Sequence, residues 1–164
     1  MKKAILPILL FTSLYATNLK AQEVRVQGEM IILGYIGQPF IGIGAGIEAP
    51  LGQHFTLNFD ANWGSQEDGT AWEFRPAVNY YFGKEHKGVF VGPALKYIKL
   101  KERDESAASW ENNLYTIGFN LGVKALLSES MSFSFTASPH FATGGQQEAN
   151  VAGITAQLAL GYRF

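Results

Sequence analysis

The chain has 164 residues, of which 16% are charged, 13% are aromatic and 18 are glycine. This length is enough for one domain with a sizeable core, and the charged fraction is low for a soluble domain. There is no cysteine, which excludes a disulfide framework, a thiolate nucleophile and a cysteine-ligated metal site.

The beginning of the chain has the organisation of a secretory signal peptide. Two lysines precede an apolar run from Ala4 to Tyr15, and Ala21 is the expected residue before the cleavage site. The run is shorter than the roughly 20 residues that a membrane-spanning helix needs. We therefore predict a signal peptide over residues 1–21 and a mature domain over residues 22–164.

The expected mature domain is weakly acidic. Loss of the three lysines in the signal leaves ten basic and 14 acidic residues, a formal charge of about −4. No basic stripe remains along the sequence, so nucleic acid is not expected as a partner.

Seven turn signals divide the remaining chain into eight segments in which apolar and polar residues alternate. The segments are 24–36, 40–49, 54–63, 70–82, 88–101, 111–127, 131–142 and 151–164. Successive side chains of a strand point to opposite faces, so each segment is predicted to be a strand with one apolar and one polar face. The last segment, VAGITAQLALGYRF, ends its apolar face with Leu160, Tyr162 and Phe164.

The alternation has local exceptions. The polar face of the first segment is interrupted at its far end by Ile31, Leu33 and Tyr35. Prolines lie inside three segments, at Pro76, Pro93 and Pro139. Because proline removes a ladder hydrogen bond, we predict local bulges at these prolines. The stretch GIGAGIE is not followed by a predicted helix that could bind phosphate, so its glycines are assigned to a crowded inner face.

Two kinds of barrel share this alternation, one embedded in a membrane and one soluble with an apolar ligand cavity. The apolar faces run for about 9–11 residues, which is the length of a tilted transmembrane strand. Aromatic residues lie near segment ends, at Trp63, Trp72, Tyr80, Tyr97, Tyr115 and Tyr162. Such residues form interfacial girdles in membrane barrels. We predict an all-β fold, an eight-stranded antiparallel transmembrane β-barrel with up-and-down meander order.

The predicted connections differ between the two ends of the barrel. Those at 50–53, 83–87 and 128–130 are short turns. Those at 64–69, 102–110 and 143–150 are longer and polar. Short turns on one side and longer loops on the other are typical of outer-membrane barrels, and the even strand number places both termini in the periplasm.

The signal peptide, the eight strands and the ending LALGYRF resemble the small eight-stranded outer-membrane barrels of the OmpA/OmpX kind. The resemblance covers nearly the whole mature chain and implies a location in the bacterial outer membrane. The implied partners are outer-membrane lipid, the barrel-insertion machinery and periplasmic chaperones. In such families the terminal aromatic strand is read during insertion, which assigns the insertion signal to Leu160, Tyr162 and Phe164.

The polar faces carry charges of both signs. An eight-stranded barrel has an interior filled by side chains, so inward charges must be paired. The predicted lumen network consists of the acids Glu29, Glu48, Asp60 and Glu73, the bases Arg75, Lys96, Lys124 and Arg163, and His140. We favour a structural salt-bridge network over a proton or ion path. No histidine lies at a zinc-ligand spacing from acids, so neither a metal nor another cofactor is predicted.

One stretch bears on catalysis. Residues 140–145, HFATGG, resemble the His-x-Ser-Asn-x-Gly stretch of the lipid A 3-O-deacylases, but Ala142 stands at the nucleophile position. The neighbouring Thr143 points to the other face of the strand. We therefore favour a non-enzymatic outer-membrane barrel that contributes to envelope structure or presents its loops for binding. A lipid A-modifying enzyme and a soluble secreted ligand-binding barrel remain as alternatives.

Overall fold

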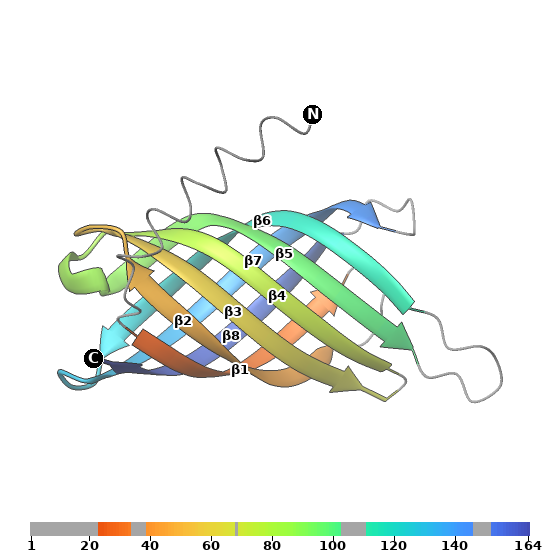
Figure 1. Cartoon of the computed structure of the whole chain (residues 1–164), viewed down its shortest axis with the longest axis horizontal. Coiled ribbons are helices and arrows are strands. Elements are labelled where there is room, and N and C mark those ends of the chain that lie inside the picture. The colour runs from red at the N-terminus through yellow and green to blue at the C-terminus, as the bar shows by residue number, and fades with distance from the viewer. Residues whose placement is uncertain (1–22, 34–38, 68, 103–110, 146–151) are drawn as a thin grey trace, which may run out of the picture.

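In the computed structural model, the described residues are 23–33, 39–67, 69–102, 111–145 and 152–164. Over these residues the chain forms eight strands, which are β1 (Glu23–Leu33), β2 (Phe40–Pro50), β3 (Phe55–Gln66), β4 (Gly69–Tyr81), β5 (Gly88–Glu102), β6 (Glu111–Leu126), β7 (Met131–Gly145) and β8 (Ala152–Arg163). Each strand pairs antiparallel with the next, and β8 pairs with β1 (Figure 1). The predicted closed meander barrel is therefore confirmed. The predicted signal peptide lies outside the described residues.

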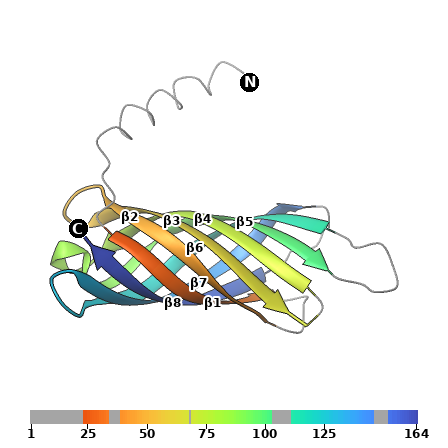
Figure 2. The same cartoon turned by 60° about the horizontal axis from the view of Figure 1, so that its bottom comes forward.

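The two ends of the barrel are distinct. We call the end where β1 begins and β8 finishes the terminal end, and the opposite one the loop end (Figure 2). At the terminal end, one turn of 3₁₀ helix, η1 (Lys84–His86), lies between β4 and β5. Among the described residues, no helix has the length and apolar character needed to cross a bilayer.

The alternation of the sequence becomes an alternation of burial. In β1 every second side chain from Glu23 to Leu33 is buried, and the side chains between them are exposed. The exposed set is apolar, with Val26 69% and Ile43 68% exposed. Polar side chains thus face inward and apolar ones face outward, as in a barrel surrounded by lipid. The soluble alternative required the opposite arrangement and is wrong.

The prolines do not produce the predicted bulges. Pro76 lies opposite Phe59 in the β3–β4 ladder, and the register on either side of it is unchanged. Pro93 and Pro139 likewise keep register with β6 and β8. A bulge requires an extra residue, whereas proline only removes a donor, so the ladder loses a hydrogen bond without shifting. Between the described strands, the register shift that does occur lies at Tyr115/Thr116, where β6 meets β7.

The predicted loop at 64–69 is mostly strand. β3 continues to Gln66 and β4 begins at Gly69, with Gln66 and Gly69 opposite each other in the ladder. The predicted six-residue loop therefore shortens to a two-residue connection. The residues after Gly64 continue the β3–β4 ladder, with Ser65 opposite Thr70 and Gln66 opposite Gly69. Of the other long connections, 103–110 and 146–151 lie outside the described residues.

An apolar cluster fills much of the interior toward the loop end, beside the buried amide of Asn112. We call this part the apolar section, and its residues are Ile31, Leu33, Phe40, Ala71, Ile98, Leu100 and Leu114. Ile31 and Leu33, which interrupted the polar face in the sequence, are 2% and 1% exposed because they point inward at this level. The middle of the interior is polar and charged, and buried aromatic side chains lie at the terminal end.

The charged lumen as candidate functional site

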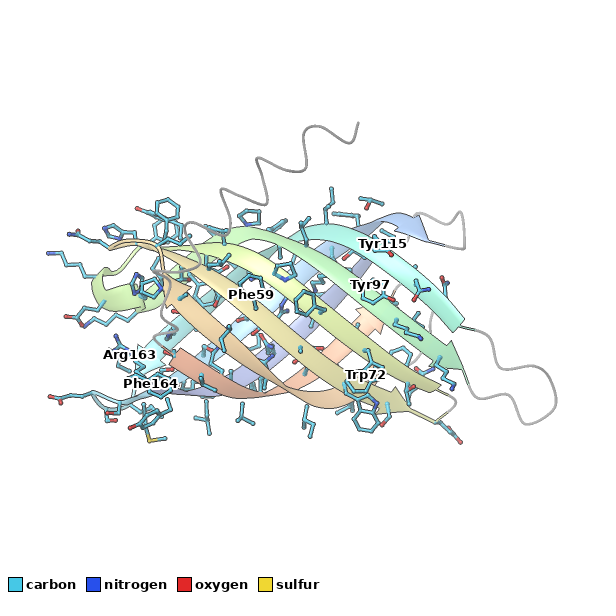
Figure 3. All side chains as sticks on the ribbon, in the orientation of Figure 1. Phe59, Trp72, Tyr97, Tyr115, Arg163 and Phe164 are labelled. Carbon is cyan, nitrogen blue, oxygen red and sulfur yellow. The ribbon has the colours of Figure 1, made fainter. Side chains whose placement is uncertain are left out.

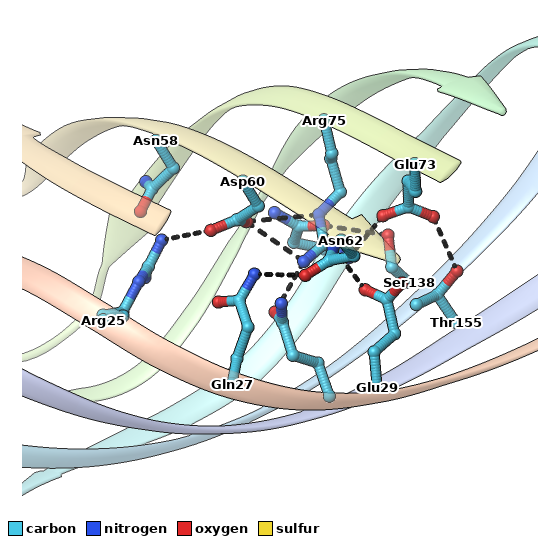
Figure 4. A network of polar contacts seen from close by, with 12 residues as sticks. Arg25, Gln27, Glu29, Asn58, Asp60, Asn62, Glu73, Arg75, Ser138 and Thr155 are labelled. Carbon is cyan, nitrogen blue, oxygen red and sulfur yellow. Dashed lines mark hydrogen bonds and ion pairs between the residues drawn. The ribbon is translucent and has the colours of Figure 1, made fainter. Parts of the chain in front are cut away.

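A continuous series of ion pairs runs through the polar part of the lumen. We call it the ion-pair chain, and its members in order are Glu23, Lys124, Glu48, Arg25, Asp60, Arg75, Glu73 and Lys96. Acids and bases alternate along it, and successive nitrogen–oxygen distances are between 2.6 and 3.7 Å. Figure 4 shows the part around Asp60 and Arg75. Pairing of this kind offsets the cost of removing each charge from water.

Strand geometry explains how the chain is assembled. Residues two apart on a strand share a face, so β1 supplies Glu23 and Arg25, and β4 supplies Glu73 and Arg75. Ladder register then places Asp60 directly opposite Arg75. The Arg75 guanidinium donates to Asp60 Oδ2 through both Nε and Nη2, at 3.3 and 3.0 Å. Two-atom contact of this type fixes the orientation of both groups.

Glycines on β2 leave the space that the charges occupy. A Cβ atom added at Gly46 would collide with the Asp60 carboxylate, and one added at Gly44 would collide with the Asn62 amide. Gly46 lies opposite Arg25 in the β1–β2 ladder. The glycine-rich stretch of β2 is therefore a recess for large polar side chains from β1 and β3, as its sequence predicted.

Several hydrogen bonds cross the lumen and join opposite walls. Arg75 Nη2 on β4 donates to Gln157 Oε1 on β8 at 2.5 Å. Lys96 Nζ on β5 donates to Thr155 Oγ1 on β8 at 2.7 Å. Lys124 on β6 reaches Glu48 on β2, with a distance of 2.9 Å between Nζ and Oε1. These contacts fill the cross-section of the barrel with ordered side chains, consistent with a plugged lumen.

Glu29 lies beside the ion-pair chain and is hydrogen-bonded to an amide side chain. Gln27 Nε2 donates to Asn62 Oδ1 at 2.6 Å, and Asn62 Nδ2 donates to Glu29 Oε2 at 2.7 Å (Figure 4). Among the described residues, Glu29 forms no direct ion pair. The Glu29 side chain is therefore held by the uncharged amides of Asn62 on β3 and, through Asn62, of Gln27 on β1.

His140 lies at the inner end of the same network. Its side chain is 0% exposed, and Nδ1 lies 3.1 Å from Lys96 Nζ and 3.0 Å from the Ser138 carbonyl oxygen. Nε2 has no hydrogen-bond partner among the described residues. The adjacent Thr143 is exposed and donates to the Tyr115 carbonyl oxygen at 3.2 Å. No pairing of His140 with a hydroxyl nucleophile is present in the described part of the chain.

Six of the nine predicted network residues belong to the ion-pair chain, and three do not. Of the predicted residues, Glu48, Asp60, Glu73, Arg75, Lys96 and Lys124 belong to the ion-pair chain, while Glu29 and His140 lie beside it. Arg163 does not join the chain. It is half-buried at the terminal end (Figure 3) and forms no ion pair with another described residue.

Two members of the chain were missed from the sequence. Glu23 precedes the first predicted strand, which begins at residue 24, and Arg25 lies within that strand but was not counted as a base of the network. The sequence pattern that would have identified both residues was present. One face of the alternating segment carries Glu23, Arg25, Gln27 and Glu29. Lys124 Nζ lies 2.6 Å from Glu23 Oε2, and Ser132 Oγ donates to Glu23 Oε1 at 2.9 Å.

Aromatic side chains close the terminal end of the lumen. The Tyr81 ring is 5.0 Å from the Phe90 ring and 5.7 Å from the His86 ring, measured between centroids. Tyr81 OH donates to Glu48 Oε2 at 3.1 Å, and His86 Nε2 lies 2.7 Å from the Gly52 carbonyl oxygen. Within the described residues, no group of three His, Asp or Glu side chains could hold a metal ion.

The residues of the predicted insertion signal lie on the outer surface. Leu160, Tyr162 and Phe164 are exposed, and the Tyr162 and Phe164 rings meet edge to face at 5.4 Å. Figure 3 shows Phe164 at the terminal end. Their reading by the insertion machinery stays a prediction.

The closed eight-stranded fold, with a polar interior and an apolar outer face, is that of a small outer-membrane-type barrel. Solved structures of that class resemble the chain. Neisserial surface protein A (NspA) has a TM-score of 0.68 at 10% identity, covering 87% of this chain and 96% of that one. The N-terminal β-barrel domain of Pseudomonas aeruginosa OprF has a TM-score of 0.59 at 15% identity, covering 88% and 100%. The attachment invasion locus protein Ail of Yersinia pestis, in complex with the heparin analogue sucrose octasulfate, gives 0.59 at 13%, covering 89% and 100%.

These structures support the resemblance to OmpA/OmpX-like barrels, and at such identities they establish the fold alone. The chain belongs to the family described as "Protein of unknown function (DUF3575)", whose sequence profile matches residues 6–158. No curated protein matches it by sequence.

Proposed function

We propose that this protein is an integral barrel of the bacterial outer membrane with a closed lumen, and that its role in the envelope is structural or depends on binding through its loop end. The observation that carries the proposal is the combination of an apolar outer face with a barrel that has no free edge. A closed barrel satisfies its backbone hydrogen bonds internally, which a lipid environment requires of any spanning structure.

Aromatic side chains at the two rims support the membrane location. Trp72 and Tyr115 are each 57% exposed near the loop end. At the terminal end, the Tyr80 ring lies 5.0 Å from the Phe55 ring and 5.2 Å from the Phe82 ring, between centroids. Tyrosine and tryptophan at both edges of an apolar band match the interfacial girdles of membrane barrels.

The filled interior favours a structural protein over a channel. A permeating ion would have to displace paired charges in the ion-pair chain and then enter the apolar section. Displacing a paired charge is unfavourable because it leaves its partner buried and uncompensated. Entering the apolar section is unfavourable because the ion loses its hydration shell. We expect no single-channel conductance when the folded barrel is reconstituted in a planar bilayer. A steady ohmic conductance would contradict the closed lumen.

The geometry around His140 favours a non-enzymatic role over the lipid A-modifying alternative. A histidine acts as a general base when it can hydrogen-bond the nucleophile it activates. His140 is buried against Lys96 and Ser138. Ala142, two residues further along β7, is partly buried against the apolar section and carries no hydroxyl group. Incubation of the folded protein with lipid A should therefore release no fatty acid.

The membrane location is tested by fractionation. The full chain, expressed in a Gram-negative host, should be recovered in the detergent-extracted outer membrane. Unheated and heated samples should migrate differently on an SDS gel, because a folded barrel resists SDS until it is heated. Recovery of a folded protein in the soluble periplasmic fraction would refute the proposal.

A further inference from the structure

The outward surface at the loop end is not uniform around the barrel. Tryptophan and tyrosine gather on β3 to β6, at Trp63, Trp72, Tyr97 and Tyr115, of which the last three are labelled in Figure 3. In the described parts of β1, β2, β7 and β8, the last large outward side chains at this end are Ile32, Ile41, Phe141 and Ile154. One side of the rim therefore presents rings with polar edges, and the other side presents hydrocarbon and a phenyl ring.

The rings form cross-strand pairs. Trp63 and Trp72 are directly opposite in the β3–β4 ladder. Tyr97 and Tyr115 are opposite in the β5–β6 ladder, with ring centroids 5.3 Å apart. Tyr97 OH donates to Asn113 Oδ1 at 2.7 Å. Rings of this kind occupy the depth of lipid headgroups, where one edge is apolar and the other is hydrated.

Two lysines follow the rings on the same outward face. Lys99 lies opposite Trp72, and Lys101 lies opposite Thr70 in the β4–β5 ladder. They come two and four residues after Tyr97 on β5, so they lie one and two steps further toward the loop end on the same face. Positive charge is thereby placed level with Trp72, at Lys99, and one step beyond it, at Lys101.

A polar depression adjoins Lys101. Its volume is about 460 Å³, and it is lined by Ser65, Gln66, Glu67, Gly69, Thr70 and Lys101. Gln66 Oε1 is a buried acceptor with no partner among the described residues. The lining offers hydroxyls, an ammonium group and a carboxylate, which together fit a ligand that carries both hydroxyl groups and an anionic group.

We propose that this patch, formed by Trp63, Trp72, Tyr97, Tyr115, Lys99, Lys101 and the depression, binds the phosphorylated sugar headgroup of a membrane glycolipid. The lysines meet the phosphate, since each basic residue at a membrane surface attracts an anionic headgroup. Glu67 and the hydroxyl side chains meet sugar hydroxyls. The Glu67 carboxylate repels a densely charged sulfated glycan more strongly than a phosphate set among sugar hydroxyls, and inorganic phosphate offers no hydroxyl groups of a sugar to the rest of the lining. The inference rests on the proposed function, because glycolipid contact requires a barrel that crosses the membrane.

The test compares two lipids that differ only in phosphate. The full-length folded barrel in detergent micelles is titrated with a bisphosphorylated diglucosamine lipid and with its phosphatase-treated form, and bound lipid is counted by native mass spectrometry. The wild type should bind the phosphorylated lipid at least about tenfold more tightly. Lys99→Gln combined with Lys101→Gln should remove that preference. Lys84→Gln combined with Lys87→Gln makes the same charge change at the terminal end and should leave it intact.

Two results would overturn the inference. One is equal binding of the two lipids by the wild type, and the other is an unchanged preference in the Lys99 and Lys101 variant. Sucrose octasulfate that displaces the lipid when equimolar with it would likewise reassign the patch to a soluble polyanion. Each sample is first checked for the heat-dependent gel shift and for outer-membrane recovery. A folded, membrane-located barrel without phosphate preference refutes only this inference, whereas a soluble protein refutes the proposed function.

Discussion

The ion-pair chain and the apolar section fill the same lumen by opposite chemistry. In the ion-pair chain each interior member touches two partners of opposite charge, so every side chain has a specified neighbour. In the apolar section, side chains such as Ile98 and Leu114 are 0% and 1% exposed and are held by packing alone. The first arrangement depends on the identity of each partner, and the second depends mainly on volume.

The two arrangements also tolerate change differently. Removing one member of a buried ion pair leaves its partner charged, buried and uncompensated. The resulting loss of stability is larger than the net stabilisation that the intact pair provided. Removing methyl groups from an apolar cluster leaves a cavity whose cost depends on how far the neighbours relax. The position of the apolar section at the loop end means that water entering from that side meets hydrocarbon before it meets charge.

The largest effect is expected from Arg75→Ala. This change removes the base that joins Asp60 to Glu73 and the donor to Gln157, so two buried carboxylates lose a partner. The free energy of unfolding should fall by about 3–5 kcal/mol. Urea unfolding of the folded barrel in phospholipid vesicles, followed by tryptophan fluorescence, measures the change.

A double-mutant cycle separates the energy of the Asp60–Arg75 interaction from the contributions that each residue makes on its own. Asp60→Asn combined with Arg75→Ala should cost less than the sum of the two single changes, because each single variant already leaves its partner unpaired. Strict additivity would show that Arg75 contributes by packing and that the ion-pair chain is not an energetic unit. Glu73→Ala should also lower the unfolding midpoint.

A smaller effect is expected in the apolar section, from Leu114→Ala. The loss of buried methyl groups and the remaining cavity should lower the free energy of unfolding by about 2–4 kcal/mol in the same urea assay. Leu114→Met keeps the volume and is the matched control, with an expected cost below about 1.5 kcal/mol. If the two variants were equally destabilised, volume would not be the quantity that holds this section together.

The architecture was predictable because strand periodicity is a local property. β6 alternates from Tyr115 to Leu126 with little interruption, so its inward and outward faces could be read directly from the letters. The same parity identified most inward charges. The alternation of residues along a strand tells which side of the sheet a side chain is on, but not how deep it lies along the barrel axis. For that reason Arg163 was assigned to the lumen network although it lies at the terminal end.

The pairing itself was not predictable. Lys124 meets Glu48 from a distance of 76 residues along the chain, and this contact depends on the stagger of the closed barrel. The division of the lumen was equally hidden. Ile31 and Leu33 looked like errors in a polar face, and they become intelligible only when side chains from β2, β4, β5 and β6 converge on them.

The smallest effect is expected for an ion pair that lies outside both parts of the lumen. Lys87 Nζ donates to Glu85 Oε2 at 2.9 Å in the turn at the terminal end, and the two side chains are largely exposed. The hydrogen bond and the charge of Lys87 hold the pKa of Glu85 below its ordinary value of 4.5. A lowered pKa means that the contribution to stability is present above the ordinary value and is lost as pH falls through the lowered one.

Lys87→Gln should therefore raise the pKa of Glu85 toward its ordinary value, read by NMR titration of the side-chain carboxyl, without moving the thermal unfolding midpoint. Exposed pairs contribute little to stability and are screened by salt, so 1 M NaCl should produce the same pKa change in the wild type. Salt should leave the cost of Arg75→Ala unchanged, because the ion-pair chain is shielded from solvent. A salt-sensitive Arg75→Ala cost would mean that water and ions reach the lumen, and the distinction between buried and exposed pairing would no longer hold.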